Sequence, residues 1–147
     1  MPRLSLLPAI GALVAFTAPH IALAADDVKS PRDAKGEAEL AEMLIGRTMG
    51  EPQRCLRDSQ RQNMQIVDRT AFVFRDGDTI YVNRPNGANF LDGFDVPVFR
   101  LFGSSLCRLD QVELRDRGSD MGGPVVVMND FIPYRPDSSD SPKEQDQ

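Results

Sequence analysis

Hydrophobic residues recur at helical spacing in one stretch of the chain, near residue 40. Leu40, Met43 and Leu44 stand at positions i, i+3 and i+4, which places them on one face of a helix. Glutamates early in this stretch and Arg47 at its end suit the helix dipole. The pattern predicts a helix over 37–47, which the glycines near its end would terminate.

Beyond residue 63 the pattern changes to short runs of β-branched and aromatic residues, which predict strands. Asp76-Gly77-Asp78 separates two of these runs, and an Asp-Gly dipeptide in that place predicts a tight hairpin. Residues 84–95 are rich in turn-forming residues and are predicted to form a loop. The predicted strands cover 64–67, 71–75, 79–83, 98–102, 106–114 and a final strand over 125–134 that is interrupted at 129–130.

These elements predict a mainly β protein. A sheet of five or six short antiparallel strands is expected to curl over one core and not to stay flat and open. We therefore expect one small curled sheet, sandwich-like or a partly open barrel, with the N-terminal helix packed on it. The single β-rich domain would cover 37–134, between a flexible leader over 25–36 and a disordered acidic tail over 135–147.

The first 24 residues have the parts of a secretory signal peptide. Arg3 supplies a positive charge, 4–23 has no charged side chain, and a cleavage motif of small residues ends at Ala24. The alternative is an uncleaved membrane anchor, which two prolines in the apolar stretch disfavour. We expect an exported protein, in the periplasm or secreted, that loses 1–24 and keeps no membrane span.

Composition then excludes several classes of function. The chain has 17 Lys and Arg against 22 Asp and Glu, and loss of Arg3 makes its net charge of −5 one unit more negative. An acidic exported protein is a poor binder of nucleic acid, because phosphate contacts require a positive face. The single histidine, His20, lies in the leader, so the mature chain would lack both a Ser-His-Asp triad and a His-ligated metal. We expect no cofactor and no metal site.

The chain has two cysteines, Cys55 and Cys107. Export places them in an oxidising compartment, where a disulfide is the usual state, and their spacing is not the C-x-x-C of a redox site. A bridge would close a loop of about 50 residues, for which the chain-entropy model gives roughly 4 kcal/mol. The alternative is a pair of free or functional thiols.

Acidic residues form two pairs of interest. Asp92 and Asp95 lie in the predicted loop, and together with Asp110 they could supply the acid and base of a glycoside hydrolase. Asp76 and Asp78 flank a glycine as in a calcium loop, but the other oxygen ligands of such a loop are missing. We therefore interpret this second pair as turn residues.

Three arginines offer a candidate basic surface. Arg54, Arg57 and Arg61 would share one face if their stretch is helical. Such a face would bind a carboxylate or a phosphate. The alternative is that these arginines are paired with acids or solvated.

Four phenylalanines lie close together in sequence: Phe90, Phe94, Phe99 and Phe102. Residues of this type are usually buried, so we expect them in the core. If Phe90 and Phe94 are instead exposed on the predicted loop, they would form a binding patch.

Short motifs follow one another in a fixed order along the second half of the chain. They are Cys55-Leu56, Ile66-Val67-Asp68, Phe72-Val73-Phe74, the hairpin run from Gly77 to Asn83, Leu106-Cys107-Arg108-Leu109-Asp110 and Phe131-Ile132-Pro133-Tyr134. Together, over 50–134, they resemble a family of small exported proteobacterial proteins catalogued as a domain of unknown function. The resemblance implies export and a β-rich fold, and it brings no established activity.

Members of that family carry two further cysteines, at places that fall near Asn89 and Val126 of this chain, where this sequence has none. The joint absence of the two implies that they pair with each other. The resemblance therefore supports a bridge between Cys55 and Cys107 as the remaining one.

We expect a non-enzymatic exported module that binds a protein or another partner in the cell envelope. The alternative is a binder of a small ligand or an oligosaccharide, including a carboxylate-based hydrolase, that uses 84–102. A third interpretation is an inhibitor whose rigid 84–95 loop enters an enzyme. A concave pocket with converging Asp, Arg and Tyr would favour a ligand, and a convex surface with exposed Phe would favour a protein partner. The sequence indicates no oligomeric state.

Overall fold

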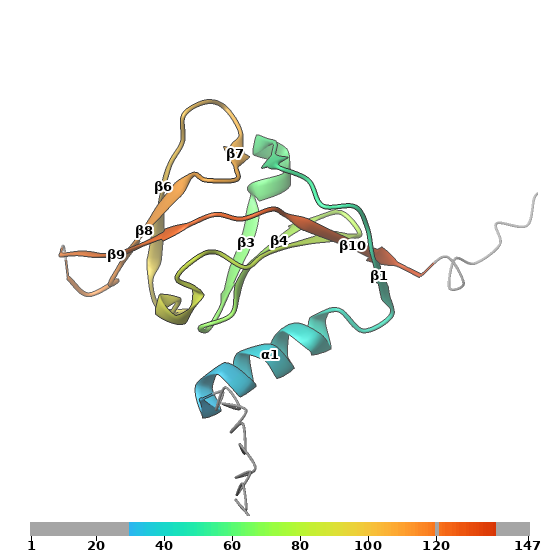
Figure 1. Ribbon diagram of the computed structural model, residues 1–147, viewed down its shortest axis with the longest axis horizontal. Helices are drawn as coiled ribbons and strands as arrows, with labels where there is room; N and C mark the ends of the chain where they lie inside the picture. The colour runs from blue at the N-terminus through green and yellow to red at the C-terminus, as the bar shows by residue number, and fades with distance from the viewer. Residues whose placement is uncertain (1–29, 120, 138–147) are drawn as a thin grey trace, which may run out of the picture.

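The computed structural model describes residues 30–119 and 121–137, and within them one helix precedes ten short strands (Figure 1). The helix is α1 (Pro31–Met43), and two 3-10 turns are η1 (Asp58–Arg61) and η2 (Ala88–Phe90). The strands are β1 (Arg47–Met49), β2 (Cys55–Leu56), β3 (Asn63–Val67), β4 (Ala71–Asp76), β5 (Thr79–Asn83), β6 (Val96–Arg100), β7 (Leu106–Cys107), β8 (Gln111–Arg115), β9 (Gly122–Val127) and β10 (Ile132–Pro136). The predicted signal peptide over 1–24 lies outside the described residues, as does the predicted tail from residue 138 onward.

The strands form three open antiparallel sheets. The largest has the order β1-β10-β5-β4-β3, a second has the order β6-β8-β9, and β2 pairs with β7. The prediction of a mainly β protein with an N-terminal helix is confirmed. The predictions of one curled sheet and of five or six strands are wrong, because β1 and β2 were not predicted and the predicted strands over 106–114 and 125–134 each divide between two sheets. The last predicted strand breaks at 128–131. Before the break β9 pairs with β8, and after it β10 pairs with β5 and β1.

A buried asparagine fixes this break. The Asn83 side chain is fully buried at the end of β5, and its amide donates hydrogen bonds to the carbonyl oxygens of Asn129 (2.6 Å) and Asp130 (3.3 Å). The predicted strand over 106–114 is also divided, around Leu109, whose φ is 76°. Both interruptions turn the chain from one sheet into another.

The five-stranded sheet is buried on both faces. In β4, Phe72 and Phe74 belong to a core cluster that includes side chains of β8 and β9, whereas Val73 belongs to a second cluster with Leu40 of α1. Alternate residues of a strand point to opposite faces, so one strand supplies both cores. Figure 1 shows the resulting arrangement, with α1 crossing one face of the largest sheet and the β6-β8-β9 sheet on the other side.

The helix begins six residues before its predicted start. Ser30 caps it, because its Oγ accepts a hydrogen bond from the Asp33 amide (3.3 Å) and the Asp33 carboxylate accepts one from the Ser30 amide (3.1 Å). The prediction of a flexible leader is therefore wrong for 31–36. At the other end of the fold, β10 continues to Pro136, so the predicted tail begins two residues too early.

Glycine is required where α1 meets the β3–β4 turn. A Cβ atom at Gly36 would lie 2.2 Å from Thr70 Oγ1 and 2.3 Å from the carbonyl oxygen of Asp68. Any larger side chain would push the helix away from this turn. The β4–β5 hairpin is confirmed as predicted, with Gly77 at a φ of 55° in its two-residue loop.

A disulfide joins Cys55 to Cys107, which stand opposite each other in β2 and β7. Their α-carbons are 4.0 Å apart. The predicted pairing is confirmed, and it is consistent with an oxidising location outside the cytoplasm. Over residues 30–119 and 121–137 no helix has both the length and the apolar character that crossing a membrane requires.

We expect removal of the disulfide to destabilise the fold, because the bridge restricts the unfolded chain over a sequence separation of 52 residues. The double variant Cys55→Ser/Cys107→Ser should lose roughly 2–4 kcal/mol of unfolding free energy, measured by urea denaturation. The wild type with reductant should match the variant. Equal midpoints for the oxidised protein and the variant would contradict this expectation.

Candidate functional site

The structure brings four of the predicted site residues together in the segment between β5 and β6. Phe90 ends η2, and Asp92, Phe94 and Asp95 follow it before β6 begins at Val96. We call residues 88–95 the aromatic loop.

Three hydrogen bonds attach the aromatic loop to the turn between β3 and β4. The Gly93 amide donates to Asp68 Oδ1 (2.7 Å), and the Arg69 amide donates to the carbonyl oxygen of Leu91 (2.9 Å). Arg69 Nη1 also donates to the carbonyl oxygen of Asn89 (2.9 Å). Leu91 itself is only 1% exposed and packs in the core. The backbone of the loop is therefore held from within the fold.

Hydrogen bonds inside the loop set the direction of its side chains. Asp92 Oδ1 accepts from the Phe94 amide (3.0 Å), and the Asp92 carbonyl oxygen accepts from the Asp95 amide (3.0 Å). The other carboxylate oxygen of Asp92 pairs with Arg32 of α1 at 3.3 Å. An aspartate bonded to its own following backbone forms a tight local turn. This turn holds Phe94 away from the core.

The phenylalanines are mostly exposed, so the expectation that they lie in the core is wrong for three of the four. Phe94 is 80% exposed, Phe90 54% and Phe102 93%, whereas Phe99 packs against Phe72 with ring centroids 6.2 Å apart. The reason is local, since Leu91 fills the buried position that the loop offers.

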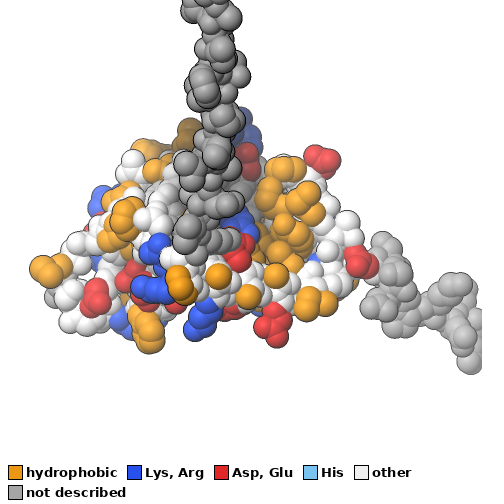
Figure 2. Space-filling view, turned by 60° about the horizontal axis from the view of Figure 1, so that its bottom comes forward, with side chains coloured by type: hydrophobic (Ala, Val, Ile, Leu, Met, Phe, Trp, Pro, Cys, Tyr) orange, Lys and Arg blue, Asp and Glu red, His pale blue; other side chains and the backbone are white. Residues whose placement is uncertain are grey.

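Exposed hydrophobic side chains are not confined to this loop. Figure 2, which brings the α1 side forward, shows them in separate groups with charged side chains between them. Ile45, which lies just before β1, is 76% exposed, and Met49, which lies in β1, is 63% exposed. The aromatic loop differs from such scattered residues because it exposes two large aromatic side chains, Phe90 and Phe94, on one short segment that is hydrogen-bonded to the β3–β4 turn.

A groove lies beside the loop, between the edge strands β3 and β6. It encloses about 430 Å³ and is lined by 64–66 of β3, Gly93 and Asp95 of the loop, Val96 and Pro97 of β6, and Arg117. We call it the β3–β6 groove. Val96 and Arg117 also line a second hollow of about 330 Å³ under the turn that follows β8.

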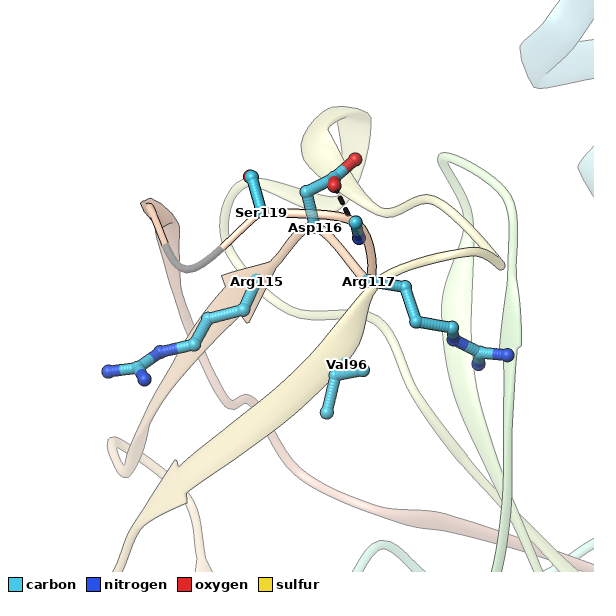
Figure 3. Close-up of a pocket in the computed structure, with 6 residues that line it drawn as sticks. Val96, Arg115, Asp116, Arg117 and Ser119 are labelled. Carbon is cyan, nitrogen blue, oxygen red and sulfur yellow. Dashed lines mark hydrogen bonds between the residues drawn. The ribbon is translucent and has the colours of Figure 1, made fainter.

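Figure 3 shows this second hollow, with Arg115 and Arg117 pointing away from each other and Val96 below them. Asp116 Oδ1 accepts a hydrogen bond from the Gly118 amide at 2.7 Å, which shapes the turn. Arg115 is engaged elsewhere, because its Nε donates to Glu113 Oε1 at 3.0 Å. Arg117 is therefore the basic side chain that lines both hollows.

Several acidic side chains lie near Asp95, which lines the groove. Burial raises the pKa of Asp95 above its usual range, and the charges of Asp92, Asp116 and Asp68 raise it further. Each proton or cation that comes near Asp95 relieves part of this repulsion. In the described part of the chain no group of three His, Cys, Asp or Glu side chains is arranged to hold a metal ion.

Two predicted groupings do not form. Asp110 lies apart from the aromatic loop, buried to 6% exposure, where its Oδ2 accepts a hydrogen bond from the Cys107 amide at 2.7 Å. It therefore shapes the turn between β7 and β8 and joins no hydrolytic pair with Asp92 or Asp95.

Arg54, Arg57 and Arg61 share no helix face, so the condition for a common basic surface is not met. Strand β2 lies between Arg54 and Arg57, and the 3-10 turn that contains Arg61 begins after them. Arg61 forms an ion pair with Asp58 at 2.6 Å.

A pocket beside α1 was missed by the sequence analysis. It encloses about 260 Å³ and is lined by Val82, Arg84, Arg108, Asn129, Asp130, Ile132 and Tyr134. We call it the Arg108 pocket. Its residues come from β5, β10, the segments next to them and the turn between β7 and β8. The β5–β10 pairing and the hydrogen bonds of Asn83 and Asn129 bring them together. Asn83, a polar residue at the end of a buried strand, was the feature of the sequence that could have indicated this pocket.

Charged groups at this pocket are only partly neutralised. Arg84 Nη1 and Nη2 donate to the two oxygens of the Glu37 carboxylate (2.5 and 2.7 Å), and these hydrogen bonds raise the pKa of Arg84. Arg108 Nη1 lies 3.6 Å from Asp130 Oδ2, which is longer than a hydrogen bond. Asp130 Oδ1 is buried and has no hydrogen-bond partner among the residues that the structure describes.

Comparison of the chain with protein-family models, with curated proteins and with solved structures finds no match. The resemblance to a family of exported proteobacterial proteins therefore stays a prediction.

We expect Asp95→Asn to raise the stability of the protein at pH 7. Because the pKa of Asp95 is raised in the folded state, the wild type loses stability as pH rises through that titration. Asparagine removes this loss. The advantage of the variant should therefore be present at pH 7 and disappear in acid, as measured by urea midpoints between pH 3 and 8.

Glu113→Gln is the matched control, and its expected change in stability at pH 7 has the opposite sign. Hydrogen bonds from Arg100 and Arg115 lower the pKa of Glu113, so its contribution is present at neutral pH and lost as pH falls through the lowered pKa. This variant should be less stable than wild type at pH 7, and the difference should shrink in acid. A destabilised Asp95→Asn at pH 7 would refute the described charge environment of the groove.

Proposed function

We propose that the mature chain is an exported, non-enzymatic module that binds a protein partner in the periplasm or outside the cell. The observation that carries this proposal is Phe94, which is 80% exposed on a loop whose backbone is hydrogen-bonded to the fold. A large apolar side chain in water gains free energy when a partner covers it. A loop that is already ordered loses little conformational entropy on binding.

Neighbouring residues extend the surface around Phe94. Phe90 is 54% exposed and Val96 is 43% exposed, so apolar groups precede and follow it along the chain. Charged groups such as Arg32 and Asp92 stand at its margin. An apolar centre with a polar rim is the usual composition of a protein interface, and aromatic residues are frequent among those that contribute most to binding.

Phe94→Ser should weaken partner binding while the fold keeps its stability, because the side chain is 80% exposed in the free protein. Crosslinking with mass spectrometry in the native envelope would identify one dominant partner. Affinity for that purified partner should fall at least about tenfold in the variant, as expected for an aromatic residue at the centre of an interface.

Phe102→Ser is the control for this test. Phe102 is 93% exposed but follows Arg100, the far end of β6, which lies about 14 Å along the strand from Val96. We expect this variant to bind the partner like the wild type. Equal crosslinking by the Phe94 and Phe102 variants, or a mature protein that stays free and monomeric in the envelope, would contradict the proposal. A reproducible turnover that is lost on mutating one carboxylate would overturn its non-enzymatic part.

A second candidate function is the binding of a small polar ligand, such as one unit of an oligosaccharide. The Arg108 pocket supports it, because Arg108, Asp130 and Tyr134 line it together with the apolar side chains of Val82 and Ile132. Arginine and aspartate side chains hydrogen-bond to hydroxyl groups, and an aromatic ring offers a stacking surface.

Arg108→Ala should remove such binding. A panel of soluble monosaccharides and short glycans would be titrated into labelled protein and followed by NMR chemical shifts of residues around the pocket. We expect saturable shifts in the wild type and in Phe94→Ser, and none in Arg108→Ala. Absence of saturable shifts in the wild type would exclude this ligand class.

A further inference from the structure

We propose that the segment bound at this site is an extended basic peptide, which adds as a strand to the free edge of β3 inside the β3–β6 groove. This inference rests on the proposed function, which it deepens by naming the chemistry of the partner. Its support comes from the backbone of β3, from the opposite wall of the groove and from the charges around it.

The outer edge of β3 has backbone groups that are free to pair. β3 is the last strand of the largest sheet, and no hydrogen bond joins the backbone of Met64 or Ile66 to anything outside that sheet in the described part of the chain. The Val67 carbonyl oxygen accepts from the Thr70 amide at 3.1 Å, within the β3–β4 hairpin. Alternate residues of an antiparallel strand direct their backbone groups to opposite sides. The amide and carbonyl groups of Met64 and Ile66 therefore point into the groove.

A second observation agrees with this direction. The carbonyl oxygen of Ile66 lies 3.8 Å from the point where a Cβ of Gly93 would be, so at this end the β3 edge is bounded by the aromatic loop and an added strand would be centred on Met64. The side chains of Met64 and Ile66 instead pack against the first core cluster. The groove thus meets β3 along its polar backbone edge, which is the surface that strand addition uses.

The opposite wall cannot form a regular ladder by itself. β6 is the edge strand of the smaller sheet, and Pro97 in it has no amide hydrogen to donate. Val96 and Pro97 instead present apolar groups to the groove. A peptide in the groove would therefore hydrogen-bond to β3 and contact β6 through side chains.

Charge selects the kind of peptide. Asp68, Asp95 and Asp116 form no ion pair with any residue between 30 and 137 that the structure describes, whereas Asp92 pairs with Arg32. Asp95 and Arg117 line the groove itself, and Asp68, Asp92 and Asp116 lie near enough to act on Asp95, so the acidic charge is concentrated around that residue. Lysine or arginine in the bound segment would be attracted, and aspartate or glutamate would be repelled.

The test begins with selection of a random heptapeptide library, displayed on phage, against the mature oxidised protein. We expect the enriched sequences to contain Lys or Arg, to alternate these with apolar residues and to lack Asp and Glu. The best sequence is then synthesised and its affinity measured. Failure to enrich any sequence, or enrichment without basic residues, would overturn the inference.

Substitutions of Asp95, which lines the groove, and of Asp116, whose charge acts on it, test the role of charge. The double variant Asp95→Asn/Asp116→Asn should bind the selected peptide at least about tenfold more weakly, and added salt should weaken wild-type binding. The control is Asp76→Asn/Asp78→Asn in the β4–β5 hairpin, at the other end of β4 from Asp68, which should bind like the wild type. Equal loss in both double variants would overturn a specific acidic groove.

N-methylation of the peptide tests strand addition. Methyl groups placed one at a time along the peptide should abolish binding at alternate positions and leave the others unaffected, because only every second amide faces β3. Uniform tolerance of N-methylation would overturn strand addition. The proposed function has its own test, because binding of the Phe94→Ser and Phe102→Ser variants is measured with the native partner and not with this peptide. A negative result with the peptide therefore leaves the proposed function standing.

Discussion

Arg69 joins the three parts of the molecule that form the candidate site. Its amide and its Nη1 donate to the backbone of the aromatic loop, at Leu91 and Asn89, and its Nε donates to Asp33 of α1. Its φ of 51° lies in the left-handed region that glycine favours, so an arginine is held there against its own backbone preference. The hydrogen bond from the Arg69 side chain also lowers the pKa of Asp33. Helix, turn and loop are thereby fixed relative to one another.

The function that we propose follows from this arrangement. Gly36 lets α1 approach the turn closely, and Asp68 and Arg69 then hold the loop, so Phe90 and Phe94 are exposed by an ordered backbone. An interface built this way does not have to order its loop on binding. The same turn ends β3, whose free edge forms one wall of the groove, so the aromatic surface and the strand edge lie side by side.

Local signals in the sequence predicted the parts of the fold that depend on local geometry. The β4–β5 hairpin follows from Gly77, and the disulfide agrees with the prediction of an exported chain with two cysteines. The three separate sheets do not follow from local pattern, because the break in the last strand depends on a buried contact of Asn83, more than 40 residues away. For the candidate site, the sequence identified the loop and its residues. It could not predict their exposure, because the choice between Leu91 and Phe94 for the core depends on how the loop is attached.

The most direct test of this account is the mobility of the aromatic loop in the free protein. Backbone ¹⁵N relaxation of the mature oxidised chain would give order parameters for residues 88–95. The account predicts values near about 0.85, like those of the strands, and a fall below about 0.6 in Arg69→Gly, which keeps the left-handed backbone and removes only the side chain. A loop that is already below about 0.6 in the wild type would contradict a preformed binding surface.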